Sequence, residues 1–305
     1  MLKNRILTAL VLAPLAIAGI LYLPDRWFAL LWGVAIAVCA WEWSNLAGLT
    51  TIPTRAGFLT VCVGFMTSFQ QWAGEMELWE WLAWPMVAFW FVLSILLREM
   101  PTKLLVIKYP IAVKLLVGFF VLVSAWILMV WTRINLGGSA QVLYLFMLVW
   151  VADIAAYFVG KRWGLTKLAP EISPGKTAEG LYGALVVIVL FSLAVAAVLY
   201  QTESGSFISF SWVKLGYFIL LSVVTVLFSV VGDLFESLVK RVGGVKDSGA
   251  ILPGHGGFTD CLLAVLACLY GCEKRIINLA RPGNICKLNR DDLYAALNFG
   301  ELVLE

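Results

Sequence analysis

The sequence predicts an all-α fold, a polytopic bundle of about eight or nine transmembrane helices. Of its 305 residues, 62% are apolar and only 13% are charged, and the mean hydropathy is +0.92. A soluble domain carries roughly 25% charged residues, about twice this share. Apolar runs long enough to span a bilayer recur along the chain. They lack the alternation of barrel strands, so helices are the structure that satisfies their backbone in lipid.

The apolar runs define the expected helices one by one. They lie at about 6–23, 27–41, 56–72, 78–97, 109–131, 141–160, 180–200 and 212–232, with a shorter run at 261–272. About 20 apolar residues cross the hydrocarbon core, so the second and third runs are marginal. The first follows basic residues, as in a signal peptide, but no small-x-small cleavage site follows it, so we expect a retained helix.

The chain shows no internal repeat, which favours a single membrane domain. We expect a transmembrane scaffold over 1–140 and a catalytic transmembrane region with two polar loops over 141–272. Residues 273–305 form a polar tail to which the sequence assigns no role. The six cysteines form no CxxC pattern, which predicts packing residues rather than disulfides or a zinc site.

Basic residues occur in alternate loops, which predicts the orientation of the chain. The loops at about 73–77 and 201–211 contain no Lys or Arg. We therefore expect the N-terminus and the basic loops on the cytoplasmic side of a bacterial inner membrane. The net charge of +3 then concerns orientation rather than nucleic acid. The basic loop residues are Lys3, Arg5, Arg98, Lys103, Lys108, Lys161, Arg162, Lys167, Lys176, Lys240, Arg241 and Lys246.

Asp153 is the first candidate site residue, because it lies within the apolar run 141–160. A charged residue at the centre of a membrane helix costs on the order of 3 kcal/mol on insertion scales. Such a residue usually faces the protein interior and has a function. A purely structural ion pair with a basic residue is the alternative.

A second polar segment contains Ser-Pro-Gly-Lys-Thr at 173–177. Its Gly-Lys-Thr is similar to the end of a Walker A motif, but that motif needs a glycine where the chain has Pro170 and a preceding soluble strand. The segment is then a turn that brings Ser173 and Lys176 to the start of the next helix, where phosphate is favoured. An ordinary turn without a ligand is the alternative.

The third segment carries the densest set of polar residues. Asp233, Glu236, Ser237, Lys240 and Arg241 are spaced three or four apart, so on a helix they share one broad face. Two acids, a hydroxyl and two bases suit a metal ion together with a polyphosphate, because Mg²⁺ takes few carboxylates and lets phosphate oxygens complete its shell. A solvated helix end with internal salt bridges is the alternative.

A glycine-rich loop follows this helix and disfavours that alternative. It contains Lys246, then Pro-Gly-His-Gly-Gly at 253–257, and then Asp260. His255 is the single histidine of the chain. Glycines let backbone N–H groups approach an anion closely, so the loop also suits phosphate binding.

Together these segments resemble the CDP-diacylglycerol synthase (phosphatidate cytidylyltransferase) family. The run Ser237-x-x-Lys240-Arg241, then Lys-Asp-Ser-Gly at 246–249 and Pro-Gly-His-Gly-Gly-x-x-Asp at 253–260, is similar to its long and specific C-terminal signature. Segments 153–160 and 167–177 are similar to two further family blocks. The resemblance is strong over about 150–260 and loose in the N-terminal half.

The resemblance implies a nucleotidyltransferase of phospholipid biosynthesis that makes CDP-diacylglycerol and pyrophosphate from CTP and phosphatidate. Its implied cofactor is Mg²⁺, with a second cation left open. The implied partners are CTP, phosphatidate and membrane lipid, with no nucleic acid, while a homodimer stays open. The implied catalytic residues are Asp233, Asp260, Ser237 and Lys240, of which Asp233 and Asp260 hold the metal. The implied substrate-binding residues are Asp153, Ser173, Lys176, Arg241, Lys246 and His255.

The chain departs from the family pattern just after Asp260. The family usually reads Asp-Arg-x-Asp there, whereas this chain has Cys261 in place of the base and Leu263 in place of the second acid. Losing a carboxylate and a cation weakens stabilisation of transition-state charge. A catalytically impaired homologue that binds lipid or nucleotide therefore stays an alternative. A secondary transporter is another, although it would tend to show inverted repeats.

These departures predict turnover well below that of a relative with the full motif. Changing Leu263→Asp and Cys261→Arg together is expected to raise turnover, because the pair restores one metal-facing carboxylate and one phosphate-facing cation. The measurement is incorporation of labelled CMP from CTP into lipid by purified protein with magnesium. No gain from the double change would contradict this explanation.

Overall fold

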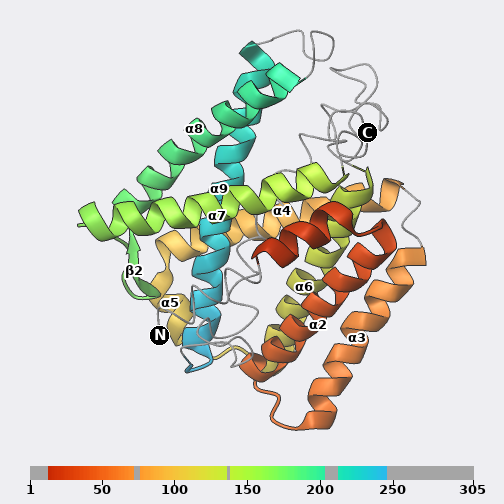
Figure 1. Cartoon of the computed structure of the whole chain (residues 1–305). Coiled ribbons are helices and arrows are strands. Elements are labelled where there is room, and N and C mark those ends of the chain that lie inside the picture. Colours follow the sequence, from red (N-terminus) through yellow and green to blue (C-terminus); the bar gives the residue numbers. More distant parts are fainter. Residues whose placement is uncertain (1–12, 72–75, 136–137, 203–211, 246–305) are drawn as a thin grey trace.

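The computed structural model describes residues 13–71, 76–135, 138–202 and 212–245, and within them the chain is almost entirely helical (Figure 1). The predicted all-α class is therefore confirmed. The short run 261–272 and the tail 273–305 lie outside the described residues.

Long helices cover the predicted apolar runs from the second to the eighth, and the first run overlaps a shorter helix, Ala13–Tyr22. The short helix α5 was not expected from the sequence. The helices are α2 (Asp25–Ala47), α3 (Ile52–Gln71), α4 (Met76–Glu99), α5 (Pro101–Val106), α6 (Ile111–Asn135), α7 (Gly138–Trp163), α8 (Ala178–Thr202) and α9 (Trp212–Val242).

Five of the described helices, α2, α6, α7, α8 and α9, are long and apolar enough to cross a membrane. Helix α3, whose run was marginal in the sequence, is not among them, and neither is α4, whose run was predicted to span. Several such helices in one chain make the protein a multi-pass membrane protein.

One feature departs from the predicted turn between α7 and α8. Strands β1 (Lys167–Ala169) and β2 (Ser173–Thr177) pair antiparallel into a two-stranded hairpin. Lys167 pairs with Thr177 and Ala169 with Ser173, with an irregularity in the register between them. The hairpin hangs below the junction of α7 and α8 in Figure 1. Strands this short carry too few residues for a period-two pattern, so the sequence did not reveal them.

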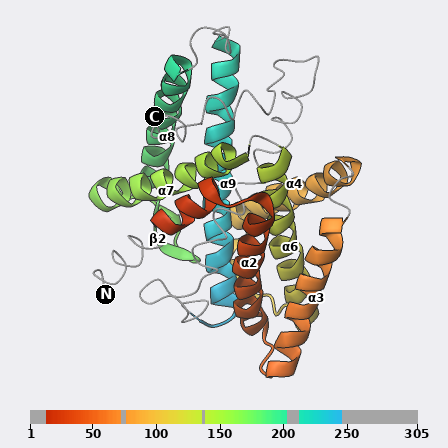
Figure 2. The same ribbon diagram turned by 45° about the vertical axis from the view of Figure 1, so that its right-hand side comes forward.

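In the N-terminal half, α2, α3 and α6 pack side by side (Figures 1 and 2). The indole of Trp43 lies directly on Gly118 of α6, where no Cβ would fit. Its Nε1 donates a hydrogen bond to the carbonyl oxygen of Lys114 at 2.9 Å. An indole that is both packed and hydrogen-bonded fixes how α2 lies against α6.

In the C-terminal half, α7 and α8 pack together and both contact α9. The hydroxyl of Tyr144 on α7 hydrogen-bonds with Ser192 Oγ of α8 at 3.0 Å and with Ser222 Oγ of α9 at 2.7 Å. Both serines are buried. Hydrogen bonds between small polar side chains are a usual means of joining membrane helices, because lipid gives no hydrophobic drive for helix association.

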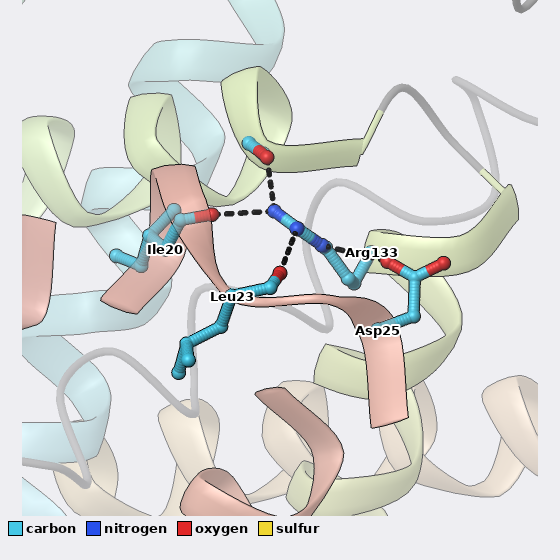
Figure 3. Close-up of polar contacts among 5 residues, drawn as sticks. Ile20, Leu23, Asp25 and Arg133 are labelled. Atoms are coloured by element: carbon cyan, nitrogen blue, oxygen red, sulfur yellow. Dashed lines mark hydrogen bonds and ion pairs between the residues drawn. The ribbon is translucent and has the colours of Figure 1, made fainter. Parts of the chain in front are cut away.

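Arg133, near the end of α6, holds the turn before α2 (Figure 3). Its guanidinium donates to the carbonyl oxygens of Ile20 at 2.5 Å and Leu23 at 2.8 Å, and to the hydroxyl of Ser139. Its Nε lies 3.1 Å from Asp25 Oδ1. The first helix ends here, so these carbonyl groups have no partner within that helix. Arg133 supplies the missing donors.

Arg133→Met is expected to lower the free energy of unfolding by about 2 kcal/mol or more, because several acceptors lose their donor at a buried position. Arg98→Met is the matched control, since Arg98 is 87% exposed in its pair with Glu99. That change should alter stability by less than about 1 kcal/mol. Thermal unfolding of the purified protein in detergent measures both. Equal effects at the two positions would contradict the role given to Arg133.

Candidate functional site

An ion pair between β2 and α9 forms the centre of the candidate site. Nζ of Lys176 pairs with Oδ2 of Asp233. The Lys176 side chain is 22% exposed, and its ammonium nitrogen is buried, whereas Asp233 is 39% exposed. The sequence predicted both residues for one site, and the structure brings them into contact from segments far apart in the chain.

Asp153 of α7 belongs to the same group. It lies within electrostatic reach of both Asp233 and Lys176. Its side chain is exposed on α7. Two carboxylates and one ammonium from α7, β2 and α9 therefore converge on one place.

The hairpin that carries Lys176 is anchored at its tip, between the two strands. Ile172, between the two strands, is fully buried in the main hydrophobic cluster. Its carbonyl oxygen lies 3.5 Å from Nε of Arg241, which donates to it from the end of α9. Arg241, a predicted substrate-binding residue, thus lies beside the hairpin that presents Lys176.

Lys240 has a partner on its own helix. Its Nζ donates to Oε1 of Glu236 at 2.6 Å, one turn earlier, and Glu236 is only 3% exposed. The sequence placed Lys240 among the catalytic residues and Glu236 as one of two acids on a face suited to a metal ion, with internal salt bridges as the alternative; this pair is one such salt bridge. The four-residue spacing of an acid and a base was the signal that could have paired them.

The other predicted residues are more peripheral or lie outside the described part. Ser237 is half-buried one turn beyond Asp233, and Ser173 is half-buried at the start of β2. Lys246, His255 and Asp260 lie outside the described residues, so the expected convergence of Asp233 and Asp260 stays a prediction.

The donor set suits a magnesium ion that shares its shell with a substrate. Within the described ranges, no group of three or more His, Cys, Asp or Glu side chains could hold a metal. Asp153 and Asp233 nevertheless lie within electrostatic reach of each other. Mg²⁺ is usually bound by one or two carboxylates, with water and substrate phosphates completing the octahedron. The residues present fit such an ion.

Comparison with known proteins gives a consistent result. Residues 3–272 match the cytidylyltransferase family. The chain is 35% identical to a phosphatidate cytidylyltransferase of Pseudomonas aeruginosa over 284 residues, which cover 88% of this chain and 94% of that protein. It is 33% identical to one of Haemophilus influenzae over 275 residues, 85% of this chain and 93% of the relative. A Staphylococcus aureus phosphatidate cytidylyltransferase is 46% identical over 123 residues, 40% of this chain and 44% of that one.

Changing the Glu236–Lys240 pair can distinguish a structural from a functional role of Lys240. Lys240→Met leaves a buried carboxylate without this cation, so we expect a loss of about 3 kcal/mol in unfolding free energy. Adding Glu236→Gln should restore most of it, because no charge then remains uncompensated. Lys103→Met, at an exposed lysine, is the control and should change stability by less than about 0.5 kcal/mol.

We expect the double variant to regain stability but not activity, because Lys240 is also expected to face phosphate. Thermal unfolding and labelled-CTP turnover of the same samples test this. Recovery of activity together with stability would make Lys240 a purely structural residue.

Proposed function

The chain belongs to the cytidylyltransferase family, and we propose that it is a phosphatidate cytidylyltransferase. In this reaction CTP and phosphatidate give CDP-diacylglycerol and pyrophosphate. The observation that carries the proposal is the convergence of Asp153, Lys176 and Asp233 in a chain related to such enzymes over 88% of its length. A charged side chain in a membrane helix raises the free energy of insertion. Three charged side chains that meet from separate segments therefore favour a site for a polar substrate.

The chemistry asks the protein mainly for alignment and charge neutralisation. An oxygen of the lipid phosphate attacks the α-phosphorus of CTP, the new P–O bond forms, and the bond to the β-phosphate breaks to release pyrophosphate. A phosphate monoester already carries between one and two negative charges near neutral pH, so no strong general base is needed. Lys176, Arg241 and Lys240 would neutralise and orient phosphate oxygens.

Asp233 would hold a divalent cation, with Asp153 close by and Asp260 as the expected second ligand. Such an ion, when bound, supplies Lewis-acid stabilisation of charge on the phosphates. Lys176 neutralises Asp233 in the arrangement described here. The same ammonium would therefore stand next to the metal-bound phosphates and could donate to their oxygens. The family's use of CTP supports a divalent cation, and the small carboxylate set favours Mg²⁺.

We further propose that the protein lies in a bacterial inner membrane with this site on the cytoplasmic side. Its relatives are bacterial proteins. The site lies close to basic residues at the end of α7, in the hairpin and at the end of α9, namely Lys161, Arg162, Lys167, Lys176, Lys240 and Arg241. Basic loops stay in the cytoplasm by the positive-inside rule, and CTP is a cytoplasmic substrate.

A catalytically impaired homologue is the second candidate, favoured by Cys261 and Leu263 alone. One assay separates the two. Purified protein is incubated with labelled CTP, magnesium and phosphatidate in mixed micelles, and labelled lipid is measured. We expect labelled CDP-diacylglycerol that requires both magnesium and phosphatidate. Binding of CTP without any labelled lipid would support the impaired homologue instead.

Asp233→Asn is expected to lower the rate of CDP-diacylglycerol formation by about a hundredfold or more, because it removes the carboxylate that is expected to hold the metal. Glu99→Gln removes an exposed carboxylate and should leave the rate unchanged. The rates are compared at several magnesium concentrations. A D233N enzyme with an unchanged rate and magnesium dependence would exclude Asp233 as a metal ligand.

A further inference from the structure

Thr177, the residue after Lys176, is enclosed where α7 packs against the start of α8. Thr177 is 7% exposed. A Cβ added to Gly160 of α7 would lie 2.8 Å from Thr177 Oγ1, and one added to Gly164 would lie 2.7 Å from its Cγ2. Real Cβ atoms do not approach neighbours this closely, so Gly160 must be glycine for the threonine to fit, while a Cβ on Gly164 would also clash with the carbonyl oxygen of Gly160.

The hydroxyl of Thr177 also caps α8. Its Oγ1 accepts a hydrogen bond at 3.2 Å from the backbone N–H of Gly180, which lies three residues later in the chain. This contact satisfies one of the free N–H groups at the start of a helix. Gly180 is itself pressed against α7, since an added Cβ would lie 2.8 Å from the carbonyl oxygen of Ala156. The cap therefore lies inside the α7–α8 contact.

The backbone around Thr177 is fixed as well. Thr177 pairs with Lys167 across the hairpin. The next N–H, that of Ala178, donates to the carbonyl oxygen of Thr166 at 2.9 Å. Thr166 in turn donates its N–H to the carboxylate of Glu179 at 3.0 Å. Strand pairing, helix cap and helix crossing thus all act on one residue.

Alternation along the strand links this anchor to the site. Successive side chains of a strand point to opposite faces. With Thr177 directed into the α7–α8 crossing, Lys176 is directed the other way, and there it meets Asp233 of α9. The Cα atoms of the two residues are only about 3.8 Å apart, so a shift of Thr177 moves the base of the Lys176 side chain directly.

We infer that Thr177 is a positioning residue, whose hydroxyl, seated on Gly160 and capping α8, sets the place of the Lys176 ammonium in the site. It touches no substrate and acts through Lys176. The expected effect of Thr177 on catalysis rests on the proposed function. The position of the Lys176 side chain can be measured without any enzymatic activity.

The first test is the reactivity of Lys176 toward a small amine-acylating reagent, read by peptide mass spectrometry on the full-length protein in detergent. In the wild type the buried, paired ammonium reacts slowly. Thr177→Val keeps the shape but removes the acceptor, and is expected to raise labelling of Lys176 several-fold. Thr177→Ser keeps the hydroxyl and should restore slow labelling.

Two further variants test whether the change in Lys176 labelling is specific to the Thr177 contact. Thr51→Val makes the same chemical change just before α3, where Thr51 is exposed and hydrogen-bonds with Thr54, and should leave Lys176 labelling unchanged. Gly160→Ala keeps the threonine but crowds its hydroxyl, and should raise labelling as Thr177→Val does. Equal labelling in the wild type, Thr177→Val and Gly160→Ala would overturn the inference.

The second test uses turnover of labelled CTP and a double-mutant comparison. Thr177→Val should lower kcat/KM by about tenfold to a hundredfold, as a misplacement of catalytic groups by about 1 Å does, with Thr177→Ser close to wild type. In a Lys176→Met background, Thr177→Val should cause no further loss, because the residue acts through Lys176. Multiplying losses would show a role independent of Lys176 and overturn the inference. A wild type without turnover but with the expected labelling pattern would count against the proposed function alone.

Discussion

Hydrocarbon offers no partner to a charged group, and this constraint determines how the polar residues of the chain are arranged. Arg133, Lys176 and Lys240 are cations among apolar helices, and each meets a carboxylate of the protein, Asp25, Asp233 and Glu236 respectively. A charge left unpaired at such a position would be strongly destabilising. Two of these pairs, Arg133–Asp25 and Lys176–Asp233, join different elements, so the chain must pack in a way that lets them form.

The pairs differ in what they do. Arg133 uses its planar donors to satisfy carbonyl groups at the end of the first helix, so it joins the turn before α2 to α6 and α7. The Lys240 pair closes on its own helix. Of the three pairs, Lys176–Asp233 is the one that connects the hairpin to α9, and it is partly open to solvent. A buried ion pair adds little net stability, so an accessible one at a junction of three elements is better explained by ligand binding.

The sequence predicted most of the helices because their apolar length is a strong and local signal. It singled out Asp153 as a charge in an apolar run, Lys176 by a turn at the start of a helix and Asp233 by its polar helix face, and the resemblance implied that they belong to one site. It missed the hairpin, whose strands are too short to show a period, and with it the role of Thr177. That role depends on glycines of α7 meeting the start of α8, a contact between segments that no local pattern reveals. The glycine-rich loop with His255 and Asp260 was predicted by resemblance and lies outside the described residues.

The length of α9 explains how one helix can serve both the membrane and the site. Its 31 residues extend over about 46 Å at 1.5 Å per residue, whereas the hydrocarbon core is about 30 Å thick. A helix that crosses the core with its apolar first part, from Trp212 onward, therefore brings Asp233 and the residues after it to the boundary with water. There a lipid phosphate and a water-soluble nucleotide can meet. Asp153, ten residues before the end of α7, lies about 15 Å inside that helix end by the same rise. Asp233 lies nine residues before the end of α9, about 14 Å inside it, so the two acids lie at similar distances from their helix ends and can meet where α7 and α9 cross, as they do in both views (Figures 1 and 2). The packing of α7 against α9 thus becomes a condition for the site, and the Tyr144 hydroxyl that joins α7, α8 and α9 helps to hold these helices together.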